Sequence, residues 1–343
     1  MKYWSEIRGQ DRPKEVLERA IETGRVHHAY LFAGLRGVGK YTTALAFSAV
    51  VNCQERDPDG FADACGECKS CRKIAEGYHP DVFTVAPEGG SKRIKIEQIR
   101  EIQEAAVKQP HEARYRMVLI DEAHAMTTEA ANALLKTLEE PSSRMRLIVI
   151  TDQAHRLLET IISRCQELRF SGLSTEEVLP ILREELAADE DIEEVPDAST
   201  LRLAANYGEG SVGRSLEVVT SGMLEQRRQL VESVLDRPAG RTEPLIDLAE
   251  ELGRGNDALD DQLDVLKLFF RDLMFYKTTG ESDRLVNTDL TDAIDEYADR
   301  YSVADLTDII DELLDAQQSI DRQVNPQFLL EDLLPRLHPV ERQ

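Results

Sequence analysis

The chain has 343 residues and carries 65 Asp and Glu against 41 Lys and Arg, a formal net charge of -24. A chain of this length is expected to form two or three domains rather than one core. Phosphate neutralisation supplies most non-specific affinity for DNA, so this acidity argues against a protein that binds duplex DNA on its own, and it indicates a solvated surface or an adaptation to salt. Every long apolar run is interrupted by charge, and the start MKYWSEIRGQDRPKEV lacks the apolar core of a secretory signal, so we expect a cytoplasmic protein without membrane contact.

The segment up to Phe170 alternates short apolar runs with helical patterns. This alternation is typical of a doubly wound α/β domain, and near-continuous apolar strands indicate a parallel sheet that is covered on both faces. The predicted strands are Ala29–Ala33, Asp81–Val85, Met117–Asp121 and Leu147–Thr151.

A glycine-rich loop follows the first predicted strand and leads into the helical run Thr43–Val50. Glycines allow backbone N–H groups to surround phosphate oxygens, the helix start adds positive potential, and a lysine supplies a point charge. Strand, loop and helix stand in the order that a P-loop requires, so a glycine turn with an incidental lysine is the weaker interpretation. The predicted nucleotide-binding residues of this loop are Gly34, Gly37, Val38, Gly39, Lys40 and Tyr41.

Tyr41 departs from the motif, which has Ser or Thr after the lysine so that a hydroxyl can ligate Mg²⁺. A phenol carries its oxygen further out on a rigid ring, and Thr42 points about 100° around the helix. Binding of ATP or ADP through Lys40 and the backbone stays open. A complete Mg²⁺ site and efficient hydrolysis are not expected.

Four cysteines come next, Cys53 and then the CxxCxxC run Cys65, Cys68 and Cys71. Four thiolates at this spacing can close a tetrahedral zinc site, and the loop between the first two cysteines is long enough to bring them together. An iron–sulfur cluster also takes four thiolates, and unligated thiols are a third interpretation. The missing proline after the third cysteine argues against a cluster, and a reducing cytosol disfavours a disulfide. We predict structural zinc, with Cys165 standing apart.

Asp121 and Glu122 end the third predicted strand, at the edge where open α/β sheets bind ligands. In a nucleotide site Asp121 would hold Mg²⁺ and Glu122 would polarise the attacking water. The plainer interpretation is that both carboxylates cap the following segment. Thr151, at the end of the next strand, is placed to contact a γ-phosphate.

The pattern predicts a helix over Thr127–Glu140, capped by Thr127 or Thr128 and ended by Pro141. Its predicted apolar face consists of Ala131, Leu134, Leu135 and Leu138.

Arg164 follows a helix-like segment at Arg156–Ile162. A guanidinium at this place can neutralise charge that develops on a phosphoryl group in a neighbouring subunit. Without further information, however, a lone arginine is more often a surface ion-pair residue.

Strand patterns end near Ser171. A small helical unit is predicted up to about Ser221, with the acidic stretch Glu184–Glu194 as a solvated loop, and amphipathic helices follow up to a last helix that starts at Asn325-Pro326. The predicted apolar faces, each a core or a partner-binding surface, are Leu263, Leu266, Phe269, Phe270, Leu273 and Met274, and then Leu329, Leu330, Leu333 and Leu337. Three domains are predicted: residues 1–170, residues 171–221 and residues 222–343. The first of them contains a cysteine module at about 53–71.

The motifs IRGQD, HHAYLFAG, GYHPDVFTVAPEG, NALLKTLEEP and SRCQ, together with the four-cysteine insert, occur in the order in which they stand in bacterial clamp-loader subunits. The chain therefore resembles this family over residues 1–221, and NPQFLLEDLL extends the resemblance to the C-terminal helices. The resemblance implies a RecA-like AAA+ domain with a zinc module, an all-α lid and an all-α collar that builds a pentameric ring.

Within the family, the chain is more similar to the delta prime class than to the gamma/tau motor. The motor has Thr where Tyr41 stands, and its lid carries an arginine that contacts nucleotide at the position of Gly213. The resemblance implies that Arg164 serves the ATP site of an adjacent motor subunit. The intact Asp121-Glu122 pair departs from the most degenerate members.

The resemblance also implies partners: delta and gamma/tau subunits of DNA polymerase III, a sliding clamp, and primed DNA reached through the complex at the replisome. The expected function is that of a stator that supports clamp loading in DNA replication. A gamma/tau-like ATPase and, more distantly, an AAA+ motor of DNA repair remain as alternatives.

Overall fold

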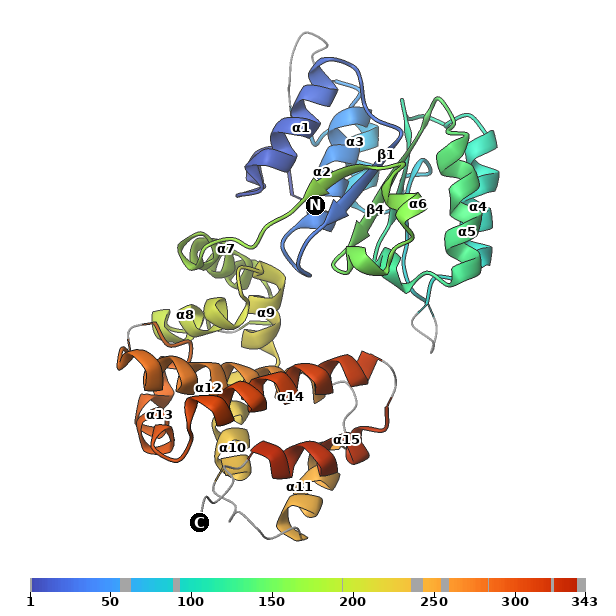
Figure 1. The fold of residues 1–343 in the computed structure, drawn as a ribbon. Helices are drawn as coiled ribbons and strands as arrows, with labels where there is room; N and C mark the ends of the chain where they lie inside the picture. Colours follow the sequence, from blue (N-terminus) through green and yellow to red (C-terminus); the bar gives the residue numbers. More distant parts are fainter. Residues whose placement is uncertain are drawn as a thin grey trace. The chain divides into compact units, whose positions relative to one another are not determined.

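The computed structural model describes residues 2–55, 63–88, 93–192, 194–235, 243–253, 259–282, 284–321 and 324–337. Three predicted features extend beyond these residues: part of the loop between Cys53 and Cys65, Gly89 at the end of one family motif, and Glu193 of the acidic stretch. The described chain forms two compact units (Figure 1). One unit comprises Met1–Glu194 and Gly208–Ser215, and the other comprises Val195–Tyr207 and Leu216–Gln343.

The first unit is built on a parallel five-stranded sheet with the strand order β2-β3-β4-β1-β5. The strands are β1 (Ala29–Ala33), β2 (Val82–Val85), β3 (Arg116–Ile120), β4 (Met145–Thr151) and β5 (Gln166–Arg169). The four predicted strands are confirmed to within two residues at either end. In this order the strand that precedes the glycine-rich loop lies beside β4, so the ends of β1, β4 and β3 share one edge.

Sequence analysis missed strand β5. Three of its four residues, Gln166, Glu167 and Arg169, are polar and exposed, and only the fourth, Leu168, is buried. Because β5 lies at the edge of the sheet and, among the described strands, pairs with β1 alone, its outer side stays solvated. An edge strand of this kind lacks the apolar run by which the other strands were predicted.

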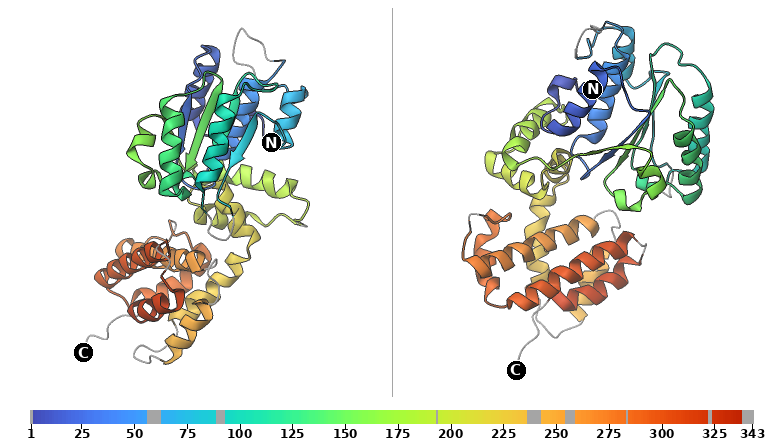
Figure 2. Two further views of the ribbon diagram at one scale, coloured as in Figure 1. Left: turned by 90° about the vertical axis from the view of Figure 1, so that its right-hand side faces the viewer. Right: turned by 45° about the horizontal axis from the view of Figure 1, so that its top comes forward.

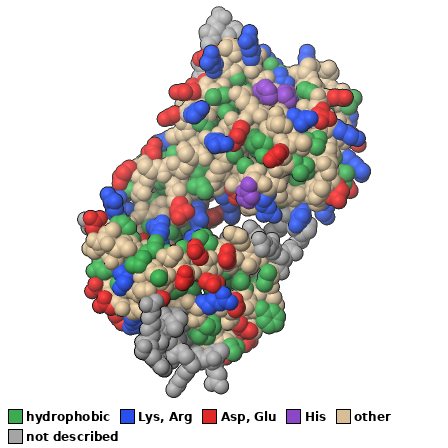
Figure 3. Space-filling model, in the orientation of Figure 1, with side chains coloured by type: hydrophobic (Ala, Val, Ile, Leu, Met, Phe, Trp, Pro, Cys, Tyr) green, Lys and Arg blue, Asp and Glu red, His purple; other side chains and the backbone are tan. Residues whose placement is uncertain are grey.

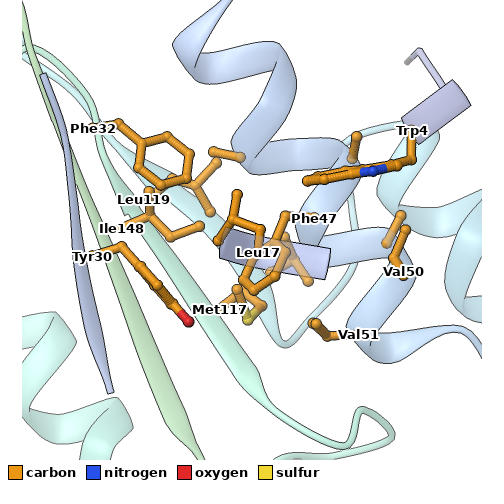
Figure 4. Packing of buried hydrophobic residues seen from close by; sticks show 14 of the residues in the cluster. Trp4, Leu17, Tyr30, Phe32, Phe47, Val50, Val51, Met117, Leu119 and Ile148 are labelled. Atoms are coloured by element: carbon orange, nitrogen blue, oxygen red, sulfur yellow. The ribbon is translucent and has the colours of Figure 1, made fainter. Parts of the chain in front are cut away.

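Helices cover both faces of the sheet (Figures 1 and 2). The alternation of side chains along each strand separates two cores. Tyr30, Phe32 and Ile148 point to one face, where they pack with Trp4, Leu17 and Phe47 (Figure 4). Leu31, Val118 and Val149 point to the other. The helices of the first face are α1 (Asp11–Glu22), α2 (Lys40–Asn52) and α3 (Lys69–Ala75), and those of the second are α4 (Ile96–Val107), α5 (Thr128–Glu139) and α6 (Glu159–Ile162).

Helix α5 confirms the prediction for Thr127–Glu140. The Thr127 side chain accepts a hydrogen bond from the Ala130 backbone N–H at 3.2 Å and so caps the helix. Ala131, Leu134 and Leu138 are buried, and Leu135 is half-buried. The segment predicted at Arg156–Ile162 is instead a short 3₁₀ turn, Ala154–Arg156, followed by the single-turn helix α6.

Three helices follow the sheet: α7 (Thr175–Ala188), α8 (Ala198–Tyr207) and α9 (Val212–Thr220). The acidic loop predicted at Glu184–Glu194 is wrong in its first half, because α7 continues to Ala188. Leu186 is buried on its inner side, and the Ser174 capping box fixes its start. The three-domain division stays a prediction, since the segment 171–221 is divided between the two compact units.

The second unit is helical. Its further helices are α10 (Met223–Leu235), α11 (Glu243–Gly253), α12 (Leu259–Thr279), α13 (Thr291–Ala298), α14 (Val303–Asp321) and α15 (Pro326–Leu333). On the predicted apolar face of α12, the five residues before Met274 are buried in the core, and Met274 itself is half-buried. Asn325 caps α15 as predicted, because its side chain accepts from the Gln327 N–H at 2.9 Å.

A buried polar network fastens α8 into this helical unit. The Tyr207 hydroxyl donates to Asn287 Oδ1 at 2.5 Å, and Asn287 donates through its backbone and side-chain nitrogens to Asp272 Oδ2 at 2.7 and 2.9 Å. Among the described residues, no helix combines the length and the apolar run that crossing a bilayer needs. Acidic and basic side chains are interspersed on the face of the molecule in Figure 3.

Candidate functional site

The glycine-rich loop connects β1 to α2, as the sequence predicts. Lys40 lies at the start of α2 and is buried, with an exposed fraction of 6%. Its ammonium donates to the carbonyl oxygens of Gly34 and Leu35, both at 2.6 Å. Burial lowers the pKa of Lys40, while the carboxylates of Asp152 and Asp121 act in the opposite direction. The lysine charge is thus held under the loop, beside acidic side chains from the ends of β3 and β4.

Tyr41 turns toward the edge of the sheet. Its hydroxyl lies 3.0 Å from Thr84 Oγ1 on β2, and the side chain is partly exposed. A hydroxyl of Ser or Thr at this position would sit one bond beyond Cβ, next to the phosphates. The phenol oxygen is instead engaged with another strand, so the residue that should complete a Mg²⁺ site contacts the protein itself.

Asp121 and Glu122 stand at the carboxyl end of β3. The Asp121 backbone N–H donates to Val85 O at 2.8 Å, and Asp121 Oδ1 accepts from the Glu122 N–H at 3.0 Å. Glu122 has a left-handed backbone with φ of 46°, and its side chain is exposed. A non-glycine residue in this conformation carries local strain, which is common at functional positions.

The Thr151 hydroxyl already has partners within the chain. It accepts from the Gln153 N–H at 3.1 Å and lies 3.3 Å from His124 Nδ1. The same His124 nitrogen lies 3.1 Å from Asp152 Oδ1. Sequence analysis gave no role to His124 or Asp152, although His124 follows the Asp121-Glu122 pair by two positions.

The start of α9 rests directly on the glycine-rich loop. The Gly213 N–H donates to Gly37 O at 3.0 Å, and a Cβ on Gly213 would lie 2.9 Å from Gly37 Cα. Gly37 has φ of +75°, and a Cβ there would approach Ser211 Oγ to 2.4 Å. Only glycine at both positions allows this contact without a shift of the backbone. The segment Gly210–Arg214 therefore lies against the loop of its own chain.

The four cysteines come together at the end of α2 and the start of α3. The sulfur atoms of Cys53, Cys65, Cys68 and Cys71 all lie within 4.8 Å of one another, whereas Cys165 packs against the other face of the sheet. A tetrahedral zinc–thiolate site places its sulfurs about 3.8 Å apart, given Zn–S bonds of about 2.3 Å. The four donors therefore fit a metal ion.

Backbone amides support the cysteine cluster. The N–H groups of Cys65, Cys68 and Cys71 donate to the sulfurs of Cys53, Cys65 and Cys68 at 3.4, 3.3 and 3.5 Å. Burial works to raise the pKa of Cys68, but the amides of Cys71 and Gln54 lower it to about 7. Gly66 adopts φ of +75°, which makes the tight turn between Cys65 and Cys68.

A buried ion pair fixes the edge of the sheet beside the cysteine module. Asp81 is fully buried and accepts from the backbone N–H groups of His111, Glu112 and Ala113 at 2.9, 2.9 and 3.1 Å. It also accepts from Arg116 at 2.9 Å, while His79 bridges to Ser70 of α3. Burial works to raise the pKa of Asp81, but the backbone donors and Arg116 hold it at about 2. Sequence analysis used His79 only as part of a family motif and Asp81 as the start of a predicted strand, and it gave neither residue a role.

Replacement of Asp81 by asparagine is expected to destabilise the protein by about 3–5 kcal/mol, because it leaves the Arg116 charge buried without its partner. Since the folded pKa of Asp81 lies below its ordinary value of 3.8, its ionisation stabilises the fold fully above about pH 4 and progressively less down to about pH 2. Between about pH 4 and pH 2, the difference in free energy of unfolding between the wild type and Asp81→Asn should therefore narrow by about 2 kcal/mol. Denaturant unfolding at several pH values measures this, and the exposed Asp191→Asn is the control. A difference that stays constant from pH 5 to pH 2 would contradict this account.

Arg164 lies outside the loop region, directly after α6. Its guanidinium donates to Glu139 Oε1 at 2.8 Å and to Thr160 O at 2.9 Å. The Arg164 and Glu139 side chains are 35% and 50% exposed. The structure therefore gathers the predicted nucleotide residues at one edge of the sheet and places Arg164 on a separate, accessible segment.

Comparisons with known proteins assign both the N-terminal and the C-terminal part of the chain to DNA polymerase III subunits. Residues 9–174 match the model of the family described as DNA polymerase III, delta subunit, and residues 221–338 match DNA polymerase III, delta subunit, C terminal. The chain is 33% identical to the DNA polymerase III subunit delta' of Bacillus subtilis, over 96% of this chain and 97% of that protein.

Two further relatives match shorter segments. The subunit delta' of Pseudomonas aeruginosa is 39% identical over 60% of each chain. The subunit tau of Escherichia coli is 33% identical over 68% of this chain but only 35% of its own length. The chain is thus similar to the delta' relative of Bacillus subtilis over nearly the full length of both proteins. Its parallel sheet has the RecA-like AAA+ fold. The chain belongs to the delta' subunit family of DNA polymerase III and is a clamp-loader subunit.

Proposed function

We propose that the chain is a stator of the clamp loader. It assembles with delta and gamma/tau subunits into a hetero-pentameric ring in the cytoplasm, at the replisome, and helps to load a sliding clamp onto primed DNA. Its sheet domain, its lid (171–221) and its collar (222–343) supply the surfaces for this assembly. In this role the subunit does not need to consume ATP.

The observation that carries the proposal is the position of the Tyr41 hydroxyl, 3.0 Å from Thr84 Oγ1 instead of beside a phosphate. Efficient phosphoryl transfer by a P-loop protein needs a hydroxyl on Mg²⁺ after the lysine. The lid contact between Gly213 and Gly37 adds to this, because ATP or ADP would have to compete with the lid for the loop.

Arg164 is proposed as the arginine that this subunit offers to the ATP site of an adjacent gamma/tau subunit. A guanidinium can stabilise the charge that develops on the transferred phosphoryl group. The partly exposed side chain of Arg164 supports this assignment, since a neighbour can reach it.

The metal of the cysteine cluster is proposed to be zinc, held by Cys53, Cys65, Cys68 and Cys71. Four sulfur donors leave no open coordination position on a tetrahedral ion. When bound, such an ion clips α3 to the end of α2 and has no part in catalysis.

A second candidate function is a gamma/tau-like ATPase, which the intact Asp121-Glu122 pair favours. In that case Glu122 would polarise water at the chain's own site. The two functions predict opposite results for ATP hydrolysis by the isolated chain.

The purified chain is expected to hydrolyse ATP no faster than background, and Glu122→Gln is expected to leave that rate unchanged. Mixed with delta and gamma/tau, the same chain is expected to enter a complex that elutes as one species and whose ATPase responds to primed DNA. Radiolabelled ATP and size-exclusion chromatography measure both properties. Turnover by the isolated chain that Glu122→Gln abolishes would overturn the stator in favour of the motor.

A further inference from the structure

Helix α5 ends beside Arg164. Glu139 is the last residue of α5, and α5 packs against α6, which leads into Arg164 (Figure 1). Leu134 and Leu138 anchor α5 in the core on that face of the sheet, and Ile161 anchors α6 in the same core. The two backbones that carry Glu139 and Arg164 are therefore fixed relative to each other.

The arginine segment is also fixed on its other side. Cys165 packs against the same core, and burial raises the pKa of its thiol to about 12. Cys165 is half-buried, and a thiol whose pKa is raised in this way is unreactive and acts as a small apolar residue. Arg164 thus projects from a backbone that is anchored at Ile161 and at Cys165, and only its side chain is left to be oriented.

Glu139 and the Thr160 carbonyl orient that side chain. The bonds of 2.8 Å from one guanidinium nitrogen to Glu139 Oε1 and of 2.9 Å from the other to Thr160 O hold the planar group at two points. These contacts use two of the five N–H groups that a guanidinium carries. The remaining donors stay available to a phosphate, and a planar group held at two corners presents them in a defined direction.

We propose that Glu139 is a positioning residue for Arg164, which holds the guanidinium in the orientation that a neighbour's phosphoryl group requires. This inference rests on the proposed function of Arg164. In this role Glu139 acts on turnover through Arg164 and not by a contact of its own with the nucleotide. The ordinary alternative is an exposed ion pair without consequence, since many such pairs contribute nothing measurable.

The test is a double-mutant cycle in the reconstituted complex of this chain with delta and gamma/tau, followed by its DNA-stimulated ATPase. At the site that Arg164 serves, Glu139→Ala is expected to lower turnover by about 3- to 10-fold and to leave KM for ATP unchanged, because orientation matters in the transition state. The whole complex should then lose no more of its rate than Arg164→Ala removes. Glu139→Gln, whose amide oxygen can still accept the bond, is expected to stay within about 3-fold of the wild type. In the Arg164→Ala background, Glu139→Ala should have no further effect.

Glu140→Ala is the matched control, because Glu140 is the exposed neighbour of Glu139. Normal assembly and thermal unfolding of Glu139→Ala establish that the variant is folded. Three results would overturn the inference: wild-type turnover in Glu139→Ala while Arg164→Ala is impaired, equal losses in Glu139→Ala and Glu140→Ala, or a Glu139→Ala loss that persists without Arg164. If Arg164→Ala itself has no effect, the proposed function fails first, and the positioning role fails with it.

Discussion

Cys68→Ser will release the metal from the cysteine module and loosen the turn Cys65–Cys68 and helix α3. The four sulfurs lie within 4.8 Å of one another, and three of them already accept backbone N–H bonds that prepare them for a metal. Structural zinc contributes about 10–16 kcal/mol of apparent binding free energy in small domains. Loss of one thiolate should therefore reduce the metal content from about one zinc per chain to a small fraction of that.

Metal analysis of the purified protein and protease sensitivity of the module measure this effect. Cys165→Ser is the matched control, because Cys165 lies outside the cluster and should leave the zinc content unchanged. A visible charge-transfer absorption band would identify iron instead. Full zinc content in Cys68→Ser would show that the four cysteines do not act together.

Arg164→Ala will lower the DNA-stimulated ATPase of the assembled complex while leaving assembly intact. Where an arginine acts in trans on phosphoryl transfer, it is worth about 10³–10⁵ in kcat at the site that it serves. The total rate of the ring should fall by the share that this site supplies. Because the Arg164 side chain is partly exposed and its hydrogen bonds go to the exposed Glu139 and to the Thr160 carbonyl, its loss should not disturb the fold.

Arg164→Lys should restore little of the lost activity, since lysine keeps the charge but lacks the planar fork. The control is Arg156→Ala, an exposed arginine on the preceding turn whose side chain bonds to Gln153. An ATPase equal to the wild type in Arg164→Ala would refute the trans role. Equal losses in Arg164→Ala and Arg156→Ala would indicate a general effect of surface charge.

The sequence predicted most of the sheet domain because its strands and helices carry strong local signals. Apolar runs marked β1 to β4, and the pattern with its Thr127 cap marked α5. Strand β5 was missed because an edge strand with one buried side chain carries no such run. The length of α7 was underestimated because an acidic stretch on a solvated helix face looks like a loop in sequence.

Only part of the candidate site could be predicted, because sequence patterns reveal neighbours along the chain but not contacts made by folding. Residues adjacent in sequence, such as those of the loop and of the CxxCxxC run, could be assigned from spacing. Contacts between distant segments could not: Gly213 on Gly37, Glu139 on Arg164 and Arg116 on Asp81 each join residues that only the fold brings together. His124 could have been noted from its place after Asp121-Glu122, but its bond to Thr151 depends on the order of the strands.

The central claim is that this subunit acts on a neighbour's nucleotide and not on its own. The most direct measurement compares two variants in the same reconstituted complex with delta and gamma/tau: Glu122→Gln, which alters only this chain's own site, and Arg164→Ala, which alters only what it offers to a neighbour. The account predicts wild-type DNA-stimulated ATPase for Glu122→Gln and a marked loss for Arg164→Ala. A loss in Glu122→Gln with normal turnover in Arg164→Ala would contradict it.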